Sequence, residues 1–223
     1  MGKWFLAMIF LALPAAATEL TWPVRCPDGS ERGCLTNISY PDIDGDGHDS
    51  GCILVSSRAH TGTDLVPTQN SVEAGVAVIA ASPGKVIFMQ DEMYDQCPAD
   101  HPECLPASRL KIRPNYQGGY TSCTAQGQYC REDQPGCFWC FSGNYVVLEH
   151  EEGSFTSYLH LKKGSVAVTP GQAIEAGQQI GLVGSSGNSE GPHLHFEVWN
   201  GGLFKPVDPW RGDCGEPDAI WDR

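Results

Sequence analysis

The sequence has few basic residues. Only 14 Lys and Arg stand against 27 Asp and Glu in 223 residues, which gives a formal net charge of −13 at pH 7. A protein that binds nucleic acid needs a basic surface to face the phosphates, so the composition argues against nucleic-acid partners. It also argues against capture by an anionic surface through charge alone.

Long apolar runs are also missing. Residues 4–13 form an apolar stretch that is too short to span a bilayer as a helix, and no later stretch is long enough. With Lys3 before it and Ala15-Ala16-Ala17 after it, this stretch predicts a secretory signal peptide over residues 1–17. An uncleaved anchor is the alternative. We expect a periplasmic or secreted protein with no transmembrane segment once the signal is removed.

No stretch from Leu20 onward has the periodicity of a long amphipathic helix. Short runs typical of strands are instead separated by Gly and Pro, at residues 76–81, 85–90, 144–150, 154–161, 166–168 and 179–183. This pattern predicts an all-β barrel or sandwich. The length allows one medium domain or two small ones.

The chain contains ten cysteines, at positions 26, 34, 52, 97, 104, 123, 130, 137, 140 and 214. An even number in an exported chain predicts up to five disulfides, with the connectivity left open. Six of them lie in residues 91–141, which we expect to be a disulfide-stapled surface insertion. Cys137 and Cys140 form a CxxC pair that suits a redox pair or half a zinc site, although structural disulfides are favoured in an oxidising compartment.

An acidic segment runs through residues 42–49. Asp42, Asp44 and Asp46 alternate, and Gly47 follows at the sixth position, as in the opening of a calcium loop. The twelfth position is Ile53 where an EF-hand has Glu. A shorter calcium loop that uses Asp42, Asp44, Asp46 and Asp49 is one interpretation, and a solvated acidic turn is the other.

Two histidines two residues apart, His193 and His195, stand in a run that predicts a strand with both imidazoles on one face. One imidazole can bind a metal while its neighbour handles protons; an exposed strand without function is the alternative. Upstream, His60 and Asp64 are four residues apart, about 13 Å in an extended chain. Ligands of one metal cannot be so distant, so we expect a bend at Gly62, where unusual dihedrals are tolerated.

Several motifs follow one another in a fixed order along the chain: 60-HTGTD-64, 76-VAVIAA-81, 84-GKV-86, 143-GNYVV-147, 158-YLHL-161, 168-VTPGQ-172, 176-AGQQIG-181 and 191-GPHLHFE-197. Together they resemble the lysostaphin/LytM-type zinc endopeptidases over residues 58–199, apart from the Cys-rich insertion. The resemblance implies a compact β core of the duplicated hybrid motif type. It also implies an enzyme that hydrolyses peptide cross-links of bacterial peptidoglycan.

The resemblance further implies roles for individual residues. His60, Asp64 and His195 would be the zinc ligands, and His160 with His193 would be the catalytic pair, in which either imidazole can be the base. Two imidazoles and a carboxylate suit zinc and leave a fourth position for water. Three other residues have possible roles around the site. Asn144 and Tyr158 line the substrate groove or belong to the structural framework, and Glu197 orients one of the metal ligands.

The remaining histidines are expected to be structural in the case of His150 and solvated in the case of His48 and His101. We divide the chain into a signal peptide (1–17), a Cys/Asp-rich lead-in (18–57), a peptidase domain (58–210, with the insertion at 91–141) and a C-terminal tail (211–223). The expected partners are peptide stems of peptidoglycan, joined by direct D-alanyl cross-links or by pentaglycine bridges; the oligomeric state stays open.

Two further classes of function are consistent with parts of the sequence. Some relatives have lost ligands and act as non-catalytic wall-binding proteins or activators of other wall hydrolases. That alternative predicts gaps at positions 60, 64, 160, 193 or 195, and all five positions are filled. A structural or adhesive envelope module would explain the cysteines and the acidic segment, but not these five residues.

Overall fold

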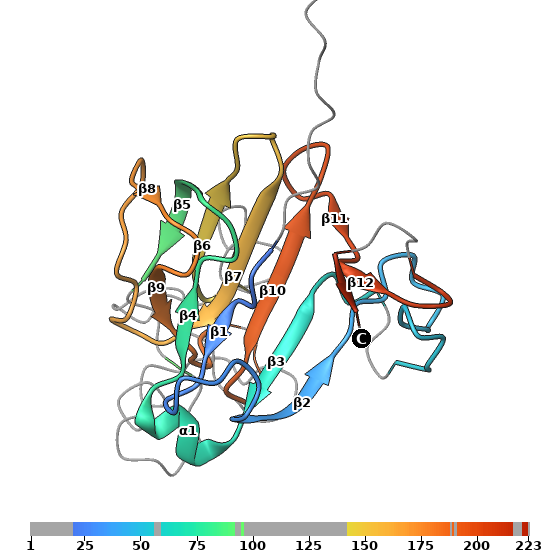
Figure 1. The fold of residues 1–223 in the computed structure, drawn as a ribbon, viewed down its shortest axis with the longest axis horizontal. Helices are drawn as coiled ribbons and strands as arrows, with labels where there is room; N and C mark the ends of the chain where they lie inside the picture. The colour runs from blue at the N-terminus through green and yellow to red at the C-terminus, as the bar shows by residue number, and fades with distance from the viewer. Residues whose placement is uncertain are drawn as a thin grey trace, which may run out of the picture.

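An antiparallel sheet of eight strands forms the largest part of this computed structural model (Figure 1). The structure describes residues 20–55, 59–91, 95, 142–187, 189, 191–215 and 220–222. In spatial order the strands are β2 (Leu35–Ser39), β3 (Thr63–Pro67), β10 (Leu194–Trp199), β7 (Phe155–Leu161), β6 (Asn144–Glu149), β5 (Gly84–Gln90) and β8 (Ala173–Ile174), and β11 (Pro206–Val207) pairs with β10. The predicted all-β class is confirmed.

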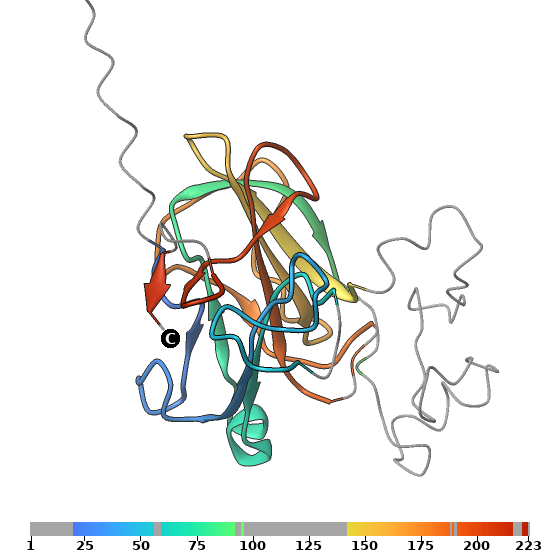
Figure 2. The ribbon, with the colours of Figure 1, turned by 90° about the vertical axis from the view of Figure 1, so that its right-hand side faces the viewer.

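A smaller sheet covers one face of the main sheet. It has three strands, in the order β1 (Val24–Arg25), β4 (Ala77–Ile79) and β9 (Gln179–Leu182). Figures 1 and 2 together show β1 and β4 lying across β7 and β10. Apolar side chains of the two sheets belong to one buried cluster, in which burial supplies most of the stabilisation.

Helix is scarce, as the sequence predicts. The helix found among the described residues, α1 (Gln69–Ala74), has six residues. The Thr68 side chain accepts the Ser71 N–H at its start, and Gly75 ends it with a φ of 94°, a left-handed value that favours glycine. In the part of the chain that the structure describes, no helix is long and apolar enough to cross a membrane.

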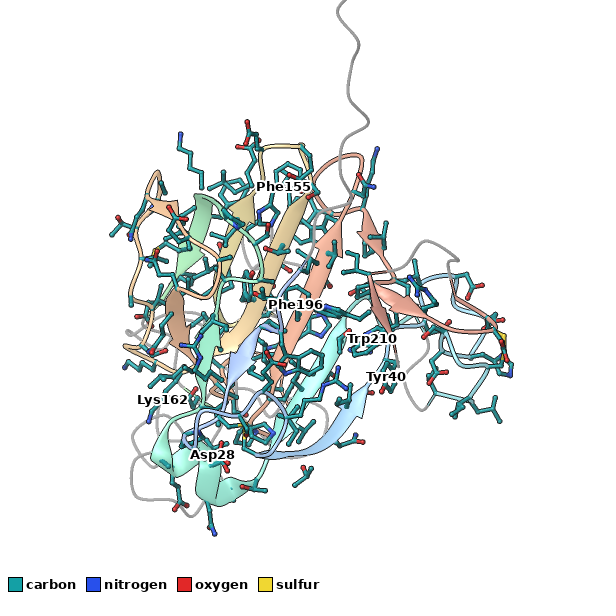
Figure 3. All side chains as sticks on the ribbon, viewed as in Figure 1. Asp28, Tyr40, Phe155, Lys162, Phe196 and Trp210 are labelled. Atoms are coloured by element: carbon teal, nitrogen blue, oxygen red, sulfur yellow. A yellow bond between two sulfur atoms is a disulfide. The ribbon has the colours of Figure 1, made fainter. Side chains whose placement is uncertain are left out.

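Aromatic side chains pack at the end of the core beside β2 and β3. The ring of Phe196 on β10 lies 5.3 Å from that of Tyr158 and 5.5 Å from that of Trp221. Trp210 lies 5.3 Å from Trp221 and 4.8 Å from Tyr40. Figure 3 shows Trp210 beside Tyr40. Trp210 and Trp221 also begin two short parallel strands, β12 (Trp210–Arg211) and β13 (Trp221–Asp222).

The predicted strands agree with the structure except in one place. Residues 85–90, 144–150, 154–161 and 179–183 correspond to β5, β6, β7 and β9, and residues 76–81 contain the shorter β4. The predicted strand at 166–168 is wrong. Ala167 donates a single hydrogen bond to the carbonyl of Ile180 without forming a ladder, while Val168 is buried in the core.

The predicted lead-in and tail share the core of the main domain. Residues 20–55 contribute β1 and β2 to the two sheets, and Trp22 and Val24 to the buried cluster. Trp221, from the predicted tail, packs against Phe196. The division at residues 57 and 210 stays a prediction. The predicted signal peptide lies outside the described residues, as does the insertion apart from Asp91 and Asp95.

Four of the cysteines lie in the described residues, and they form two disulfides. Cys26–Cys34 spans 8 residues and Cys52–Cys214 spans 162, with Cα–Cα distances of 5.6 and 5.2 Å. The prediction of oxidised cysteines is confirmed for these four. The other six, including Cys137 and Cys140, lie outside the described residues.

Replacing both Cys52 and Cys214 by Ser should lower the free energy of unfolding by about 2–5 kcal/mol, because the bridge restricts the unfolded chain across a long loop. Urea denaturation under non-reducing conditions measures the change. The pair Cys26→Ser/Cys34→Ser is a comparison with a much shorter loop, for which the chain-entropy contribution is smaller. An unchanged urea midpoint in the first variant would contradict this expectation.

Candidate functional site

The site is built on a cross-strand pair. Asp64 of β3 lies directly opposite His195 of β10 in the antiparallel register. Residues opposite one another in such a pair share a face of the sheet, so the two side chains meet. Asp64 Oδ1 lies 2.7 Å from His195 Nδ1.

His60 joins this pair from the segment that leads into β3. Its Nε2 lies 3.1 Å from Asp64 Oδ1 and 3.3 Å from His195 Nδ1. The chain bends at Gly62, as predicted, but the φ of Gly62 is not left-handed. The glycine is needed for space instead, because a Cβ there would lie 2.6 Å from both His195 Nε2 and the carbonyl oxygen of Phe196.

The donor atoms of His60, Asp64 and His195 form a group that could hold a metal ion. They lie within 4.8 Å of one another, on side chains that are 11–23% exposed. Two ligands of a tetrahedral zinc ion at about 2.1 Å lie about 3.4 Å apart. The observed separations of 2.7, 3.1 and 3.3 Å are close to that value, so the donor set fits zinc.

Two more imidazoles border this group. His193 Nε2 lies 3.7 Å from Asp64 Oδ1, and the ring of His193 lies 4.7 Å from that of His160. The rings of His160 and His195 lie 5.9 Å apart. The structure therefore brings together all five residues that the resemblance assigned to the metal and to catalysis.

A β-bulge places His160 at the site. In the register of β7 with β10, Leu159 lies opposite His195 and Tyr158 opposite Phe196, which points into the core. Strict alternation would put His160 on the core face with Tyr158. Between Val146↔Tyr158 and Asn144↔Leu161, however, β7 contains one more residue than β6, and His160 has a φ of 63°. The extra residue turns the imidazole toward His195.

Each of the four imidazoles has one ring nitrogen against a fixed oxygen. The contacts are His60 Nδ1 with Tyr40 O at 3.2 Å, His160 Nδ1 with Ser186 O at 2.8 Å, His193 Nδ1 with Gly191 O at 2.8 Å, and His195 Nε2 with Glu197 Oε1 at 3.0 Å. A carbonyl only accepts, so each Nδ1 facing one carries the proton. The lone pair then remains on Nε2 of His60, His160 and His193.

Glu197 is held by three donors. Its Oε1 accepts hydrogen bonds from Thr61 Oγ1 and His195 Nε2, and its Oε2 accepts one from Trp199 Nε1. The predicted contact of Glu197 with a histidine is therefore present. The role of Thr61 was missed, although a hydroxyl beside His60 is a signal that the sequence offers. The other histidine rings contact backbone carbonyl oxygens, which every residue has, so no residue type in the sequence marks these partners.

The electrostatics of the group are dominated by Asp64. Burial opposes its ionisation, but hydrogen bonds from His195 and His60 hold the pKa of Asp64 far below its usual value. For His195, burial is outweighed by hydrogen bonds to Asp64 and Glu197, which raise its pKa to about 9. Burial lowers the pKa of His160 well below its usual value, and it also lowers the pKa of His193. Both of these imidazoles are therefore neutral near pH 7.

Asn144 and Tyr158 are the two residues predicted to line the substrate groove or to belong to the framework. Both side chains are fully buried. Asn144 Nδ2 donates to the carbonyl of Leu161, and the hydroxyl of Tyr158 accepts the Ala81 N–H. The geometry supports the framework interpretation. His150 is structural as expected, with its ring nitrogens 2.8 Å from Pro83 O and 2.9 Å from Thr156 Oγ1.

In the acidic segment, three of the four aspartates named as possible calcium ligands lie close together. Asp42, Asp44 and Asp46 each place a carboxylate oxygen within 4.8 Å of the others. Asp49 lies outside this group, because its Oδ1 accepts the N–H groups of Gly51 and Ile53. His48 is 41% exposed, as expected of a solvated side chain, and His101 lies outside the described residues.

Replacing Gly62 by Ala should destabilise the protein by about 1–3 kcal/mol, because the Phe196 carbonyl cannot move away from the added methyl without disturbing β10. Thermal unfolding measures the loss. Gly191→Ala is the matched control, since a Cβ there meets nothing within 4 Å and the φ of Gly191 is not left-handed. Equal melting temperatures for the two variants would show that the close approach at Gly62 is unimportant.

One segment of the chain matches a known protein family. Residues 131–209 match Peptidase family M23. This segment includes His160, His193 and His195, whereas His60 and Asp64 precede it.

Similar proteins include two from Vibrio cholerae. Peptidoglycan DD-endopeptidase ShyA is 48% identical over 80 residues, which cover 36% of this chain and 18% of ShyA; peptidoglycan DD-endopeptidase ShyB is 45% identical over 73 residues, 33% of this chain and 16% of ShyB. The matched segment thus spans less than a fifth of these relatives.

Among solved structures, a zinc-containing peptidase from Vibrio cholerae aligns with a TM-score of 0.45 and 24% identity, over 86% of this chain and 39% of that one. The catalytic domain of lysostaphin from Staphylococcus simulans aligns with a TM-score of 0.41 and 20% identity, over 78% and 88%. The match of residues 131–209 to Peptidase family M23 bears out the resemblance found in the sequence.

Proposed function

We propose that this protein is an exported zinc endopeptidase that hydrolyses peptide cross-links of bacterial peptidoglycan. The observation that carries the proposal is the convergence of five side chains on one point: the donor group of His60, Asp64 and His195, bordered by His160 and His193. The match of residues 131–209 to a peptidase family and the similarity to proteins named peptidoglycan DD-endopeptidases support the same activity.

In this proposal His60 Nε2, Asp64 Oδ1 and His195 Nδ1 hold the zinc ion. Bound there, zinc supplies a Lewis acid that polarises a carbonyl and makes a water molecule more acidic. The oxygens of Tyr40 and Glu197 fix the rings of His60 and His195, so that the correct nitrogen of each faces the ion. Such outer contacts also reduce the reorganisation that metal binding requires.

His160 and His193 are then available for proton transfer. Each has its Nδ1 hydrogen-bonded to a backbone carbonyl and therefore presents Nε2 as the basic atom. Burial keeps both rings neutral near pH 7, which is the state that can accept a proton. One ring accepts the proton of the attacking water; the other stabilises the developing oxyanion or protonates the leaving amine.

The arrangement of charges favours an amide over a glycosidic substrate. A glycosidase needs two carboxyl groups that act directly on the sugar. The two carboxylates at this site, Asp64 and Glu197, are both hydrogen-bonded to His195. With a net charge of −13, the protein gains no attraction to anionic wall polymers, so recognition would depend on the peptide.

Export is supported by two features. Residues 1–17 have the charge, length and terminal alanines of a signal peptide. The two disulfides, one of which spans 162 residues, need an oxidising compartment. A periplasmic location follows if the substrate is a direct D-alanyl cross-link to a diamino acid, which is the bond that we favour over a pentaglycine bridge.

Single substitutions should separate metal binding from proton transfer. His60→Ala and Asp64→Ala should lose zinc and activity together. His160→Ala and His193→Ala should retain most of the zinc and lose activity at least about 100-fold, as expected for a general acid or base. Elemental analysis of the purified proteins, paired with turnover of cross-linked muropeptides, distinguishes the two groups. The exposed His48→Ala is the control and should behave like the wild type.

A zinc-free His193→Ala together with a zinc-replete His60→Ala would overturn the assignment of the ligands.

The substrate is tested with purified muropeptides. Zinc-loaded protein should convert dimers joined by a direct D-alanyl cross-link into monomers, which mass spectrometry detects as the addition of one water. Dimers joined by pentaglycine test the alternative, and His193→Ala controls for contaminating hydrolases. If zinc is bound and neither dimer is cut, the endopeptidase proposal fails, and a non-catalytic wall-binding role becomes the better explanation.

A further inference from the structure

The acidic segment lies beside the candidate metal centre but is separate from it. The acidic loop, defined here as residues 42–55, leaves the main sheet after β2 and returns toward His60. In Figure 1 it is the light-blue segment beyond β2 and β12. Three of its carboxylates, those of Asp42, Asp44 and Asp46, have oxygens within 4.8 Å of one another. None of the three forms an ion pair with a Lys or Arg among the described residues.

Asp42 is the unusual member of this group. Its side chain is buried, with 1% of the residue exposed. Oδ2 accepts the N–H groups of Gly47 at 3.2 Å and Ala59 at 3.1 Å, whereas Oδ1 is buried without any hydrogen-bond partner. Burial opposes ionisation, but the N–H groups of Ala59 and Gly47 keep the pKa of Asp42 below its usual value. An ionised oxygen that is buried and unpaired is costly unless a cation compensates it.

We propose that Asp42, Asp44 and Asp46 bind one calcium ion. Calcium prefers carboxylate oxygens at 2.3–2.6 Å, so that two ligands of one ion lie at most about 5 Å apart. The three oxygens satisfy this limit. Asp44 and Asp46 are exposed, which lets water complete the coordination. Asp49 is not part of the proposed site, because its Oδ1 accepts the N–H groups of Gly51 and Ile53 within the loop.

The affinity should be modest. Ile53 occupies the position at which an EF-hand has a bidentate Glu, so this loop has fewer charged ligands. Dissociation constants of about 10⁻⁴–10⁻³ M are typical of calcium sites in extracellular modules. Calcium at such concentrations is available outside the cytoplasm, which is where we propose that this protein acts.

The ion would order the loop against the segment that carries His60. The Asp42 N–H donates to the carbonyl of His60 at 2.9 Å, and the Ala59 N–H donates to the Asp42 carboxylate. Tyr40 accepts from His60 Nδ1 on the same stretch of chain. At its other end the loop is joined to the C-terminal segment by Cys52–Cys214. The calcium site itself needs no zinc, so it stands independently of the proposed peptidase activity.

Isothermal titration of the zinc-loaded full chain with calcium chloride tests the site. We expect one calcium ion per chain with a dissociation constant of about 0.1–1 mM. Asp44→Asn/Asp46→Asn should weaken binding at least tenfold and leave the zinc content unchanged, because Asn keeps the carbonyl oxygens that accept the local N–H bonds. Asp28→Asn/Glu73→Gln removes the same charge from other elements and should bind calcium like the wild type.

Three outcomes would overturn the proposal: no calcium binding by the wild type at several millimolar, unchanged binding by Asp44→Asn/Asp46→Asn, or equal loss in the control variant. Equal affinity for magnesium chloride would also overturn it, since magnesium demands a smaller octahedral site. If the double variant does not fold, as judged by circular dichroism, Asp44→Asn alone replaces it with the same expected direction. None of these measurements depends on peptidase activity.

Discussion

The register between β3 and β10 is the constraint on which the site depends. It sets Asp64 opposite His195, and a slip by one residue would turn one of them into the core. The same strand β10 continues the register into β7, where Leu159 lies opposite His195. The buried residues on the other face, Leu65, Phe196 and Tyr158, make a slip by one residue expensive, because it would turn buried side chains toward the solvent. Packing of the core face therefore fixes the positions at which the opposite, polar face carries its histidines.

A second layer of contacts sets the chemistry of the rings. Four imidazoles lie close together, and each is restricted by an oxygen on the side away from the centre. Three of these oxygens are backbone carbonyls, which cannot be lost by substitution of the residue that carries them. The fourth belongs to Glu197, which Thr61 and Trp199 hold in turn. The site is thus largely preorganised by the fold, with little dependence on mobile side chains.

Much of this could be predicted from the sequence, and the failures have physical causes. Alternation placed His193 and His195 on one face, and Gly and Pro marked most strand ends. Strict alternation gives the wrong face for His160, because a bulge and a left-handed φ are invisible in a residue pattern. Asn144 and Tyr158 stand among motif residues, yet their burial depends on contacts with Leu161 and Ala81 from other strands. Carbonyl partners carry no side-chain signal at all.

The Cys52–Cys214 bridge has a consequence for proteolysis. His60 and Asp64 precede residues 96–141, whereas His160, His193 and His195 follow them. A single backbone cut within 96–141 would divide the chain into two fragments, each with part of the site. Cys52 lies on one fragment and Cys214 on the other, so the fragments would remain covalently joined. Pairing of β3 with β10 would still hold Asp64 against His195. A nicked molecule would therefore run as one species without reductant and as two with it, and it would retain the side chains of its site in place.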